Sequence, residues 1–177
     1  IVMPESTALV KIRRTEGYGA RVVLHGANWD ASQEHAQSLA CESGAPLIHP
    51  FDDPLVIEGQ GTVGLEILED LPHVEVVVVP VGGGGLVAGI ALAIKAARPD
   101  VRIVGVQAEG APSAYLTWQA QAWRTAAINT YAAGLATGEP FMLPQQTLWA
   151  YLDDFVLVSD DEISAAITAA LEARGIR

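Results

Sequence analysis

The chain carries the stretch VVVVPVGGGGLVAGIALAIKAA at residues 76–97. A run of β-branched residues precedes the four glycines, and an alanine-rich segment with helical spacing of apolar residues follows them. This pattern predicts a strand, a tight turn and a helix. Because glycine loses more backbone freedom on folding than any other residue, we expect four of them in a row to serve a purpose that needs a bare backbone.

A turn of this kind can bind an anion. The first N–H groups of a helix have no acceptor within the helix, and they lie at the positive end of its dipole. The loop at 82–85 contains no lysine or arginine, so neutral amides alone would hold a phosphate there. The alternative is a turn that only allows helix and strand to pack closely.

Two other classes of phosphate site fit the loop less well. The glycine spacing is not GxGxxG, and no acidic residue about 20 positions further on ends a second strand, which opposes a dinucleotide-binding domain. No GK[ST] follows the glycines, which excludes a Walker loop.

Composition narrows the class of protein further. The 177 residues include 10 basic and 21 acidic ones, and the formal net charge of −11 argues against a nucleic-acid partner. No apolar run reaches the roughly 18 residues that a membrane span needs. The single cysteine, Cys41, cannot form an internal disulfide and fits the reducing cytoplasm.

Strand-like and helix-like segments alternate along the chain. We predict strands at 1–4, 21–26, 45–50, 74–81, 101–107 and 154–160, and helices that include 7–19, 29–44 and 54–71. This order predicts an α/β fold, a parallel sheet with helices on both faces. The continuous valine run at 76–79 predicts a strand buried on both sides. We expect residues 121–146 to form a long loop.

Two prolines and two aspartates interrupt the pattern between Ile48 and Pro54. We therefore predict one domain at 1–48 and another at 49–177. His49, Asp52 and Asp53 lie at this junction, where they could act near an active cleft. A structural role, capping a hinge, is the favoured interpretation.

Several motifs follow one another in an order that resembles a known family. They are HPFDDPLVIEGQGTVGLEIL (49–68), PVGGGGLVAGI (80–90), VRIVGVQAEGAPSAYLTW (101–118), YAAGLA (131–136) and YLDDFVLVSDDEI (151–163). Together they resemble the pyridoxal-phosphate lyases of the tryptophan-synthase-β fold group (fold type II), above all threonine dehydratase and serine racemase. The resemblance covers essentially the whole chain, and it implies part of a small α/β domain at 1–48 and part of a large cofactor-binding domain at 49–177.

The resemblance also implies site residues. The phosphate of pyridoxal 5′-phosphate would be bound by Gly82, Gly83, Gly84, Gly85 and the amide of Leu86, and Gly134 would lie beside the cofactor ring. The family usually has an aspartate where this chain has Ala133.

A metal site is not predicted. Relatives that bind a divalent cation have a glutamate and an aspartate where this chain has Gln107 and Ser113. An amide and a hydroxyl are poor ligands for Mg²⁺ or Ca²⁺.

The activity implied is that of a cytoplasmic ammonia-lyase that converts L-threonine or L-serine into a 2-oxo acid and ammonia, as a homo-oligomer in the intact enzyme. In the family the Schiff-base lysine lies upstream of the strand that opens this chain, so we predict no catalytic residue here and expect an incomplete chain that is inactive alone. Lys95 lies ten residues beyond Gly85, too far to return to the loop, and Lys11 belongs to a basic helix face. The alternatives are serine racemase or another β-eliminating lyase, and a non-catalytic fragment or pseudoenzyme.

Overall fold

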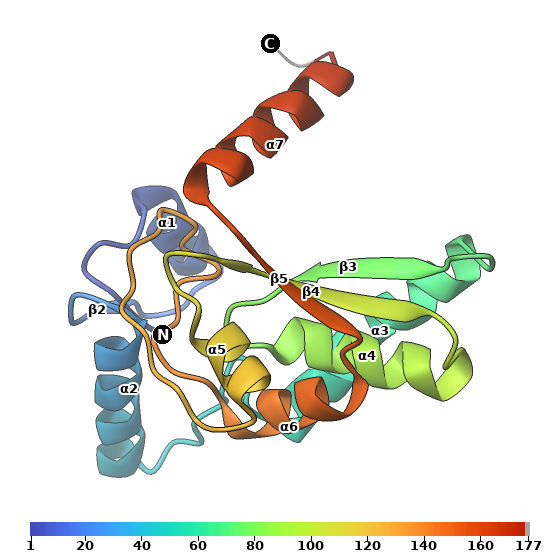
Figure 1. Ribbon diagram of the computed structural model, residues 1–177. Helices are drawn as coiled ribbons and strands as arrows, with labels where there is room; N and C mark the ends of the chain where they lie inside the picture. Colours follow the sequence, from blue (N-terminus) through green and yellow to red (C-terminus); the bar gives the residue numbers. More distant parts are fainter. Residues whose placement is uncertain (176–177) are drawn as a thin grey trace. The chain divides into compact units, whose positions relative to one another are not determined.

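The computed structural model describes residues 1–175, which form two compact units (Figure 1). The first unit comprises Ile1–Ile48, and the second begins at His49. No helix in the described part of the chain is both long and apolar enough to cross a membrane.

The first unit is built around one pair of short parallel strands. β1 (Val2–Met3) pairs with β2 (Val23–Leu24), with Val2 opposite Val23. The unit also contains α1 (Leu9–Gly17) and α2 (Trp29–Ser43). The side chain of Asn28 caps the start of α2 by accepting a hydrogen bond from the N–H of Ala31 at 3.0 Å, and Gly44 ends the helix in the left-handed conformation, as its sequence predicts.

One predicted strand of this region is wrong. Residues 45–50 form no strand in the structure. Pro46 and Pro50 have no N–H group to donate, which leaves this short apolar segment poorly suited to a sheet.

The second unit is an α/β fold with a three-stranded parallel sheet. The strands are β3 (Val76–Pro80), β4 (Arg102–Ala108) and β5 (Asp154–Val158), in the order β3-β4-β5. Its helices are α3 (Pro54–Asp70), α4 (Gly85–Ala97), α5 (Ser113–Ala120), α6 (Met142–Tyr151) and α7 (Asp160–Ala173). The predicted fold class, parallel strands flanked by helices, is confirmed.

The core of this unit lies between the sheet and α4. Val77 and Val79 of β3 are buried there with Val87, Ile90 and Ile94 of α4. In Figure 1, α3, α4 and α6 lie together beside the strands.

The other face of β3 is not covered within the described chain. Val76 is 45% exposed and Val78 is 62% exposed, so the prediction of a strand buried on both sides is wrong for this structure. The strand lies at the edge of the sheet, and every second side chain points away from the core.

The predicted loop at 121–146 is correct only in part, because α6 begins at Met142. Pro144 lies in the first turn of this helix, where the N–H that proline lacks would have no intrahelical acceptor. A proline read as a loop signal thus lies inside a helix.

Candidate phosphate-binding site

The glycine loop connects the end of β3 to the start of α4. Val81 still donates to the carbonyl of Val106 at 2.8 Å, which continues the pairing with β4. Gly84 then adopts a φ of 89° and caps the helix, which begins at Gly85. Only glycine takes this left-handed conformation at little cost, so one of the four glycines is needed for the turn itself.

The loop presents a row of available hydrogen-bond donors. Within the described chain, none of the backbone N–H groups of residues 82–86 donates a hydrogen bond. They lie at the positive end of the α4 dipole, and no basic side chain belongs to the loop. This arrangement suits an anion held by neutral donors, as a bound phosphate group would be.

Phe51 and Pro144 pack against the loop and leave no room for side chains there. A Cβ at Gly85 would lie 2.6 Å from Cβ of Phe51, and a Cβ at Gly84 would lie 2.8 Å from Cβ of Pro144. A Cβ at Gly83 would overlap the ring of Phe51. Close packing therefore accounts for part of the need for glycine in this loop.

Gly82 is the point where two predicted site segments meet. A Cβ built on it would lie 2.7 Å from the carbonyl oxygen of Gly134 and 3.1 Å from Cα of Leu135. The fold thus brings the loop at 82–85 and the YAAGLA segment side by side, although about 50 residues separate them.

Gly134 itself has no packing reason to be glycine. It is exposed, its φ is not positive, and a Cβ added to it would meet nothing within 4 Å. Open space next to the loop is what a bound group would need.

The HPFDDP motif has a structural role. Nδ1 of His49 accepts hydrogen bonds from the N–H of Asp52 at 2.7 Å and of Phe51 at 3.3 Å. Asp52 accepts from the N–H of Leu143 at 2.9 Å, which ties the motif to α6, and Asp53 caps α3 by accepting from the N–H groups of Leu55 and Val56. These bonds agree with the favoured capping interpretation.

Burial lowers the pKa of His49, although the negative charges of Asp52 and Asp53 oppose that shift. The neutral ring is the form that can accept at Nδ1.

Phe51 is the neighbour of the loop that sequence reasoning missed. Its ring packs edge-on against that of Phe141, with centroids 4.5 Å apart, and lies against Gly83. The only signal in the sequence is its position between the prolines and aspartates of HPFDDP.

The lysine on α4 has structural partners of its own. Lys95 donates to the carboxylate of Asp153 at 2.7 Å and to the carbonyl of Val101 at 2.9 Å. Ten residues at 1.5 Å per residue separate it from Gly85 by about 15 Å, so its amine does not reach the loop. Lys11 lies exposed on α1 in the other unit.

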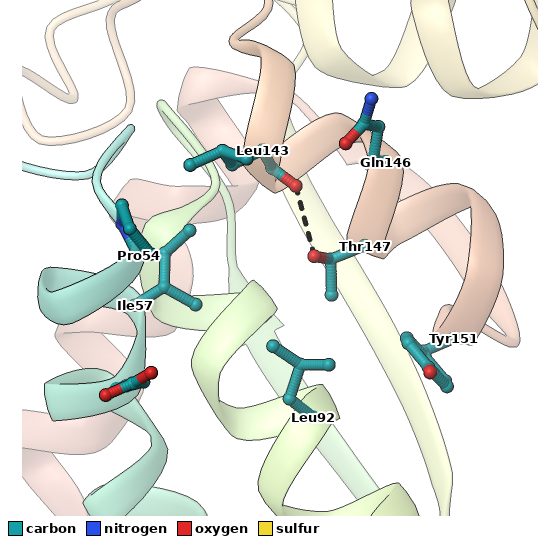
Figure 2. A pocket seen from close by; sticks show the side chains of 8 residues that line it. Pro54, Ile57, Leu92, Leu143, Gln146, Thr147 and Tyr151 are labelled. Atoms are coloured by element: carbon teal, nitrogen blue, oxygen red, sulfur yellow. Dashed lines mark hydrogen bonds between the residues drawn. The ribbon is translucent and has the colours of Figure 1, made fainter.

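A separate hollow of about 360 Å³ lies between α3, α4 and α6 (Figure 2). Its lining is mostly apolar and includes Ile57, Leu92 and Leu143. The hydroxyl of Thr147 donates its proton to the carbonyl of Leu143 in its own helix, 3.0 Å away, so that it could only accept from a ligand. This hollow does not include the glycine loop.

A strand, a glycine turn and a helix with available N–H groups, within a parallel sheet, form an arrangement at which α/β proteins can bind a phosphate group. A family model described as "Pyridoxal-phosphate dependent enzyme" matches residues 1–177. The chain therefore belongs to the family of pyridoxal-phosphate-dependent enzymes.

Relatives and solved structures agree with this membership. The chain is 46% identical over 173 residues to an L-threonine ammonia-lyase of Thermotoga maritima. The matched region covers 97% of this chain and 43% of that protein. Its fold matches the processed form of threonine deaminase isoform 2 from Solanum lycopersicum, with a TM-score of 0.90, 39% identity, and coverage of 97% of this chain and 50% of that one. Maize serine racemase also matches, with a TM-score of 0.90, 33% identity, and coverage of 97% and 52%. The chain thus spans about half the length of these relatives.

Proposed function

We propose that this chain is the cofactor-phosphate-binding part of an ammonia-lyase that acts on L-threonine or L-serine and forms a 2-oxo acid and ammonia. Its cofactor would be pyridoxal 5′-phosphate, which supplies an electron sink for the pair left at the substrate α-carbon. The observation that carries the proposal is the row of available N–H groups at residues 82–86, in a family that depends on this cofactor.

The residues present fit the phosphate group of that cofactor. The amides of Gly82, Gly83, Gly84, Gly85 and Leu86 would donate to its oxygens, and the dipole of α4 would stabilise its charge. Because the packed neighbours keep the loop in one shape, little reorganisation would be needed on binding.

Gly134 would lie beside the cofactor ring. Its carbonyl lies against Gly82, and the space beside its Cα is open. This proposal gives a reason for a glycine that local packing leaves unexplained.

The remaining assignments are also part of the proposal. Residues 1–48 would belong to a small α/β domain and residues 49–177 to a large cofactor-binding domain. The lone Cys41 favours the cytoplasm. In the intact enzyme we expect a homo-oligomer, and the residues that carry out the chemistry would lie in segments beyond those matched here.

A chimera tests the proposal. The matching segment of the Thermotoga maritima ammonia-lyase is replaced by this chain, and the product is assayed for bound cofactor, 2-oxo acid and ammonia. We expect the chimera to bind pyridoxal 5′-phosphate and to release both products from L-threonine. A folded chimera without cofactor would contradict the phosphate site, and a cofactor-loaded chimera without product would contradict the lyase assignment.

Two glycine variants of the chimera separate binding from folding. Gly134→Ala places a Cβ in the open space, so we expect a folded protein with cofactor absorbance lost or strongly reduced. Gly59→Ala is the matched control, because Gly59 also has open space around its Cβ position but lies on α3. Equal cofactor binding by both variants would contradict the role of Gly134.

Serine racemase is the second candidate, because maize serine racemase has the same fold at a TM-score of 0.90. The chimera assay includes D-serine formation from L-serine. D-serine without a 2-oxo acid would favour the racemase.

A further inference from the structure

A group of uncharged polar side chains is buried at the carboxyl end of β4. This buried polar cluster consists of Gln107, on β4, Ser113, the first residue of α5, and Thr137, in the loop before α6. Gln107 and Ser113 are fully buried, and Thr137 is 6% exposed. Oε1 of Gln107 accepts from the N–H of Tyr115 at 2.9 Å, and Oγ of Ser113 donates to the carbonyl of Thr137 at 3.0 Å.

Two atoms of the cluster have no hydrogen-bond partner within the described chain. They are Nε2 of Gln107 and Oγ1 of Thr137. Leaving a buried polar atom without a partner costs about 1–3 kcal/mol, so native proteins fill such places with ordered water or an ion. Other atoms of Gln107 and Thr137 are bonded to the first turn of α5, so both residues lie near the same end of that helix.

The side chains of the cluster are poorly suited to bind a divalent cation. Mg²⁺ and Ca²⁺ take oxygen ligands, with carboxylates among them, and the cluster contains no carboxylate. The oxygen of Gln107 is already used by Tyr115, so the group left over is an NH₂, whose hydrogens repel a cation. The site that the family resemblance implies for its cation-binding members is therefore not supported by the residues present.

A water molecule lying between the two atoms would satisfy both. Its oxygen can accept from Nε2 of Gln107, and it can donate to or accept from Oγ1 of Thr137. Buried waters in proteins typically make about three such bonds.

We propose that a buried water molecule occupies this cluster in place of a divalent cation, and that the fold of the chain does not depend on divalent cations. The water would also hold the segment that lies against the glycine loop. Thr137 follows Leu135 by two residues, and Leu135 contacts Gly82. The buried polar cluster would thus support one wall of the phosphate site without a metal.

Thermal unfolding of the chain tests whether its fold depends on divalent cations. The melting temperature is measured in EDTA and in millimolar MgCl₂, CaCl₂ or MnCl₂. We expect the same melting temperature in all four solutions. A saturable increase with one of the cations, lost in the Gln107→Met variant, would overturn the proposal.

A valine substitution tests whether a water molecule occupies the buried polar cluster. In Thr137→Val the water would lose a partner, so we expect a lower melting temperature than that of the unchanged chain. Thr117→Val calibrates the effect, because Thr117 is also buried and its hydroxyl bonds to the backbone of Arg124. A melting temperature of Thr137→Val that is unchanged or raised would indicate a dry cluster and overturn the proposal.

A double variant tests whether the cluster lacks a cation because it lacks carboxylates. Gln107→Glu with Ser113→Asp places two carboxylates in the cluster, and we expect the melting temperature to fall in EDTA and to rise when Ca²⁺, Mg²⁺ or Mn²⁺ is added. If the variant is unfolded in EDTA, we expect a cation to restore its folded circular-dichroism spectrum. Failure of all three cations to stabilise or restore it would contradict the role given to residues 107 and 113.

Discussion

At Gly83 only a hydrogen fits, because a Cβ would overlap three ring carbons of Phe51. We expect Gly83→Ala to lower the free energy of unfolding by about 1–3 kcal/mol, since the ring or the loop must move. Urea denaturation of the chain measures the change. In the double variant with Phe51→Ala the penalty of the alanine should be smaller, and an equal penalty with and without the ring would contradict this contact.

We predict that His49 makes the stability of the folded chain depend on pH. Its Nδ1 accepts two hydrogen bonds, and its pKa in the folded chain is lowered below the ordinary value of 6.5, chiefly by burial. Its contribution is therefore fully present above pH 6.5 and is lost as the pH falls from there through the lowered pKa. Urea denaturation between pH 5 and 8 should show a steeper loss for the unchanged chain than for His49→Asn, and parallel profiles would contradict the assignment.

Local chemistry explains which site residues could be predicted. The strand, the turn and the helix that we propose as the phosphate site follow from four adjacent glycines between a β-branched run and a segment with helical spacing, because the whole signal lies within 22 residues. The packing of Phe51 on Gly83 joins residues 32 positions apart, and no pattern in one sequence reports such a contact. The contact of Gly82 with Gly134 could be reached only through the family resemblance.

At the scale of elements, α3 and α4 pack through their glycines. Gly61 and Gly64 of α3 face the backbone of Gly89 and Ile90 on α4, at 3.3 and 3.1 Å from the position a Cβ would take. Three glycines lie within α3, and this close contact explains two of them. The third, Gly59, has open space around it.

This difference gives opposite predictions for two glycines. Gly59→Ala should stabilise the chain by about 0.5–1 kcal/mol, because alanine loses less backbone entropy in an exposed helix position. Gly89→Ala should destabilise it, because the new Cβ would lie 2.6 Å from the backbone nitrogen of Gly61. Chemical denaturation of both variants measures the signs, and a stabilising Gly89→Ala would contradict the helix contact.

The elements themselves were predictable where their signals are strong and local. The alternation of strands and helices from residue 54 onward is confirmed, apart from the start of α6. The prediction of a strand at 45–50 was wrong. A short apolar segment becomes a strand only where it can pair with another, and the two prolines of this segment have no N–H group to donate. The prediction that the valine run is buried was wrong for one face of the strand, because composition does not show what covers a sheet.

At the scale of the whole molecule, the uncovered face of the sheet is an exposed apolar surface of the described chain. Val76, Val78 and Val156 are 45%, 62% and 39% exposed, and β3 is an edge strand. Parallel sheets normally have both faces covered, and exposed edges favour association. We therefore expect the chain to self-associate.

Sedimentation velocity measures this association. Val76→Thr with Val78→Thr should shift the chain towards monomer and change its stability little, because both side chains are exposed. Val77→Thr is the matched control on the buried face, and it should destabilise the fold. Equal self-association of the unchanged chain and the double variant would contradict an interface on this face.

The most direct test of the central claim is an amide ¹H–¹⁵N NMR titration of the chain with pyridoxine 5′-phosphate. This ligand has the phosphate of the cofactor but no aldehyde, so it cannot form adducts with Lys11, Lys95 or the N-terminus. Pyridoxine, which lacks the phosphate, is the control. We predict that the signals of residues 82–86 shift with the phosphate ester and not with pyridoxine. Signals at 82–86 that stay unchanged, or that shift equally with both ligands, would contradict the assignment of this loop as the phosphate site.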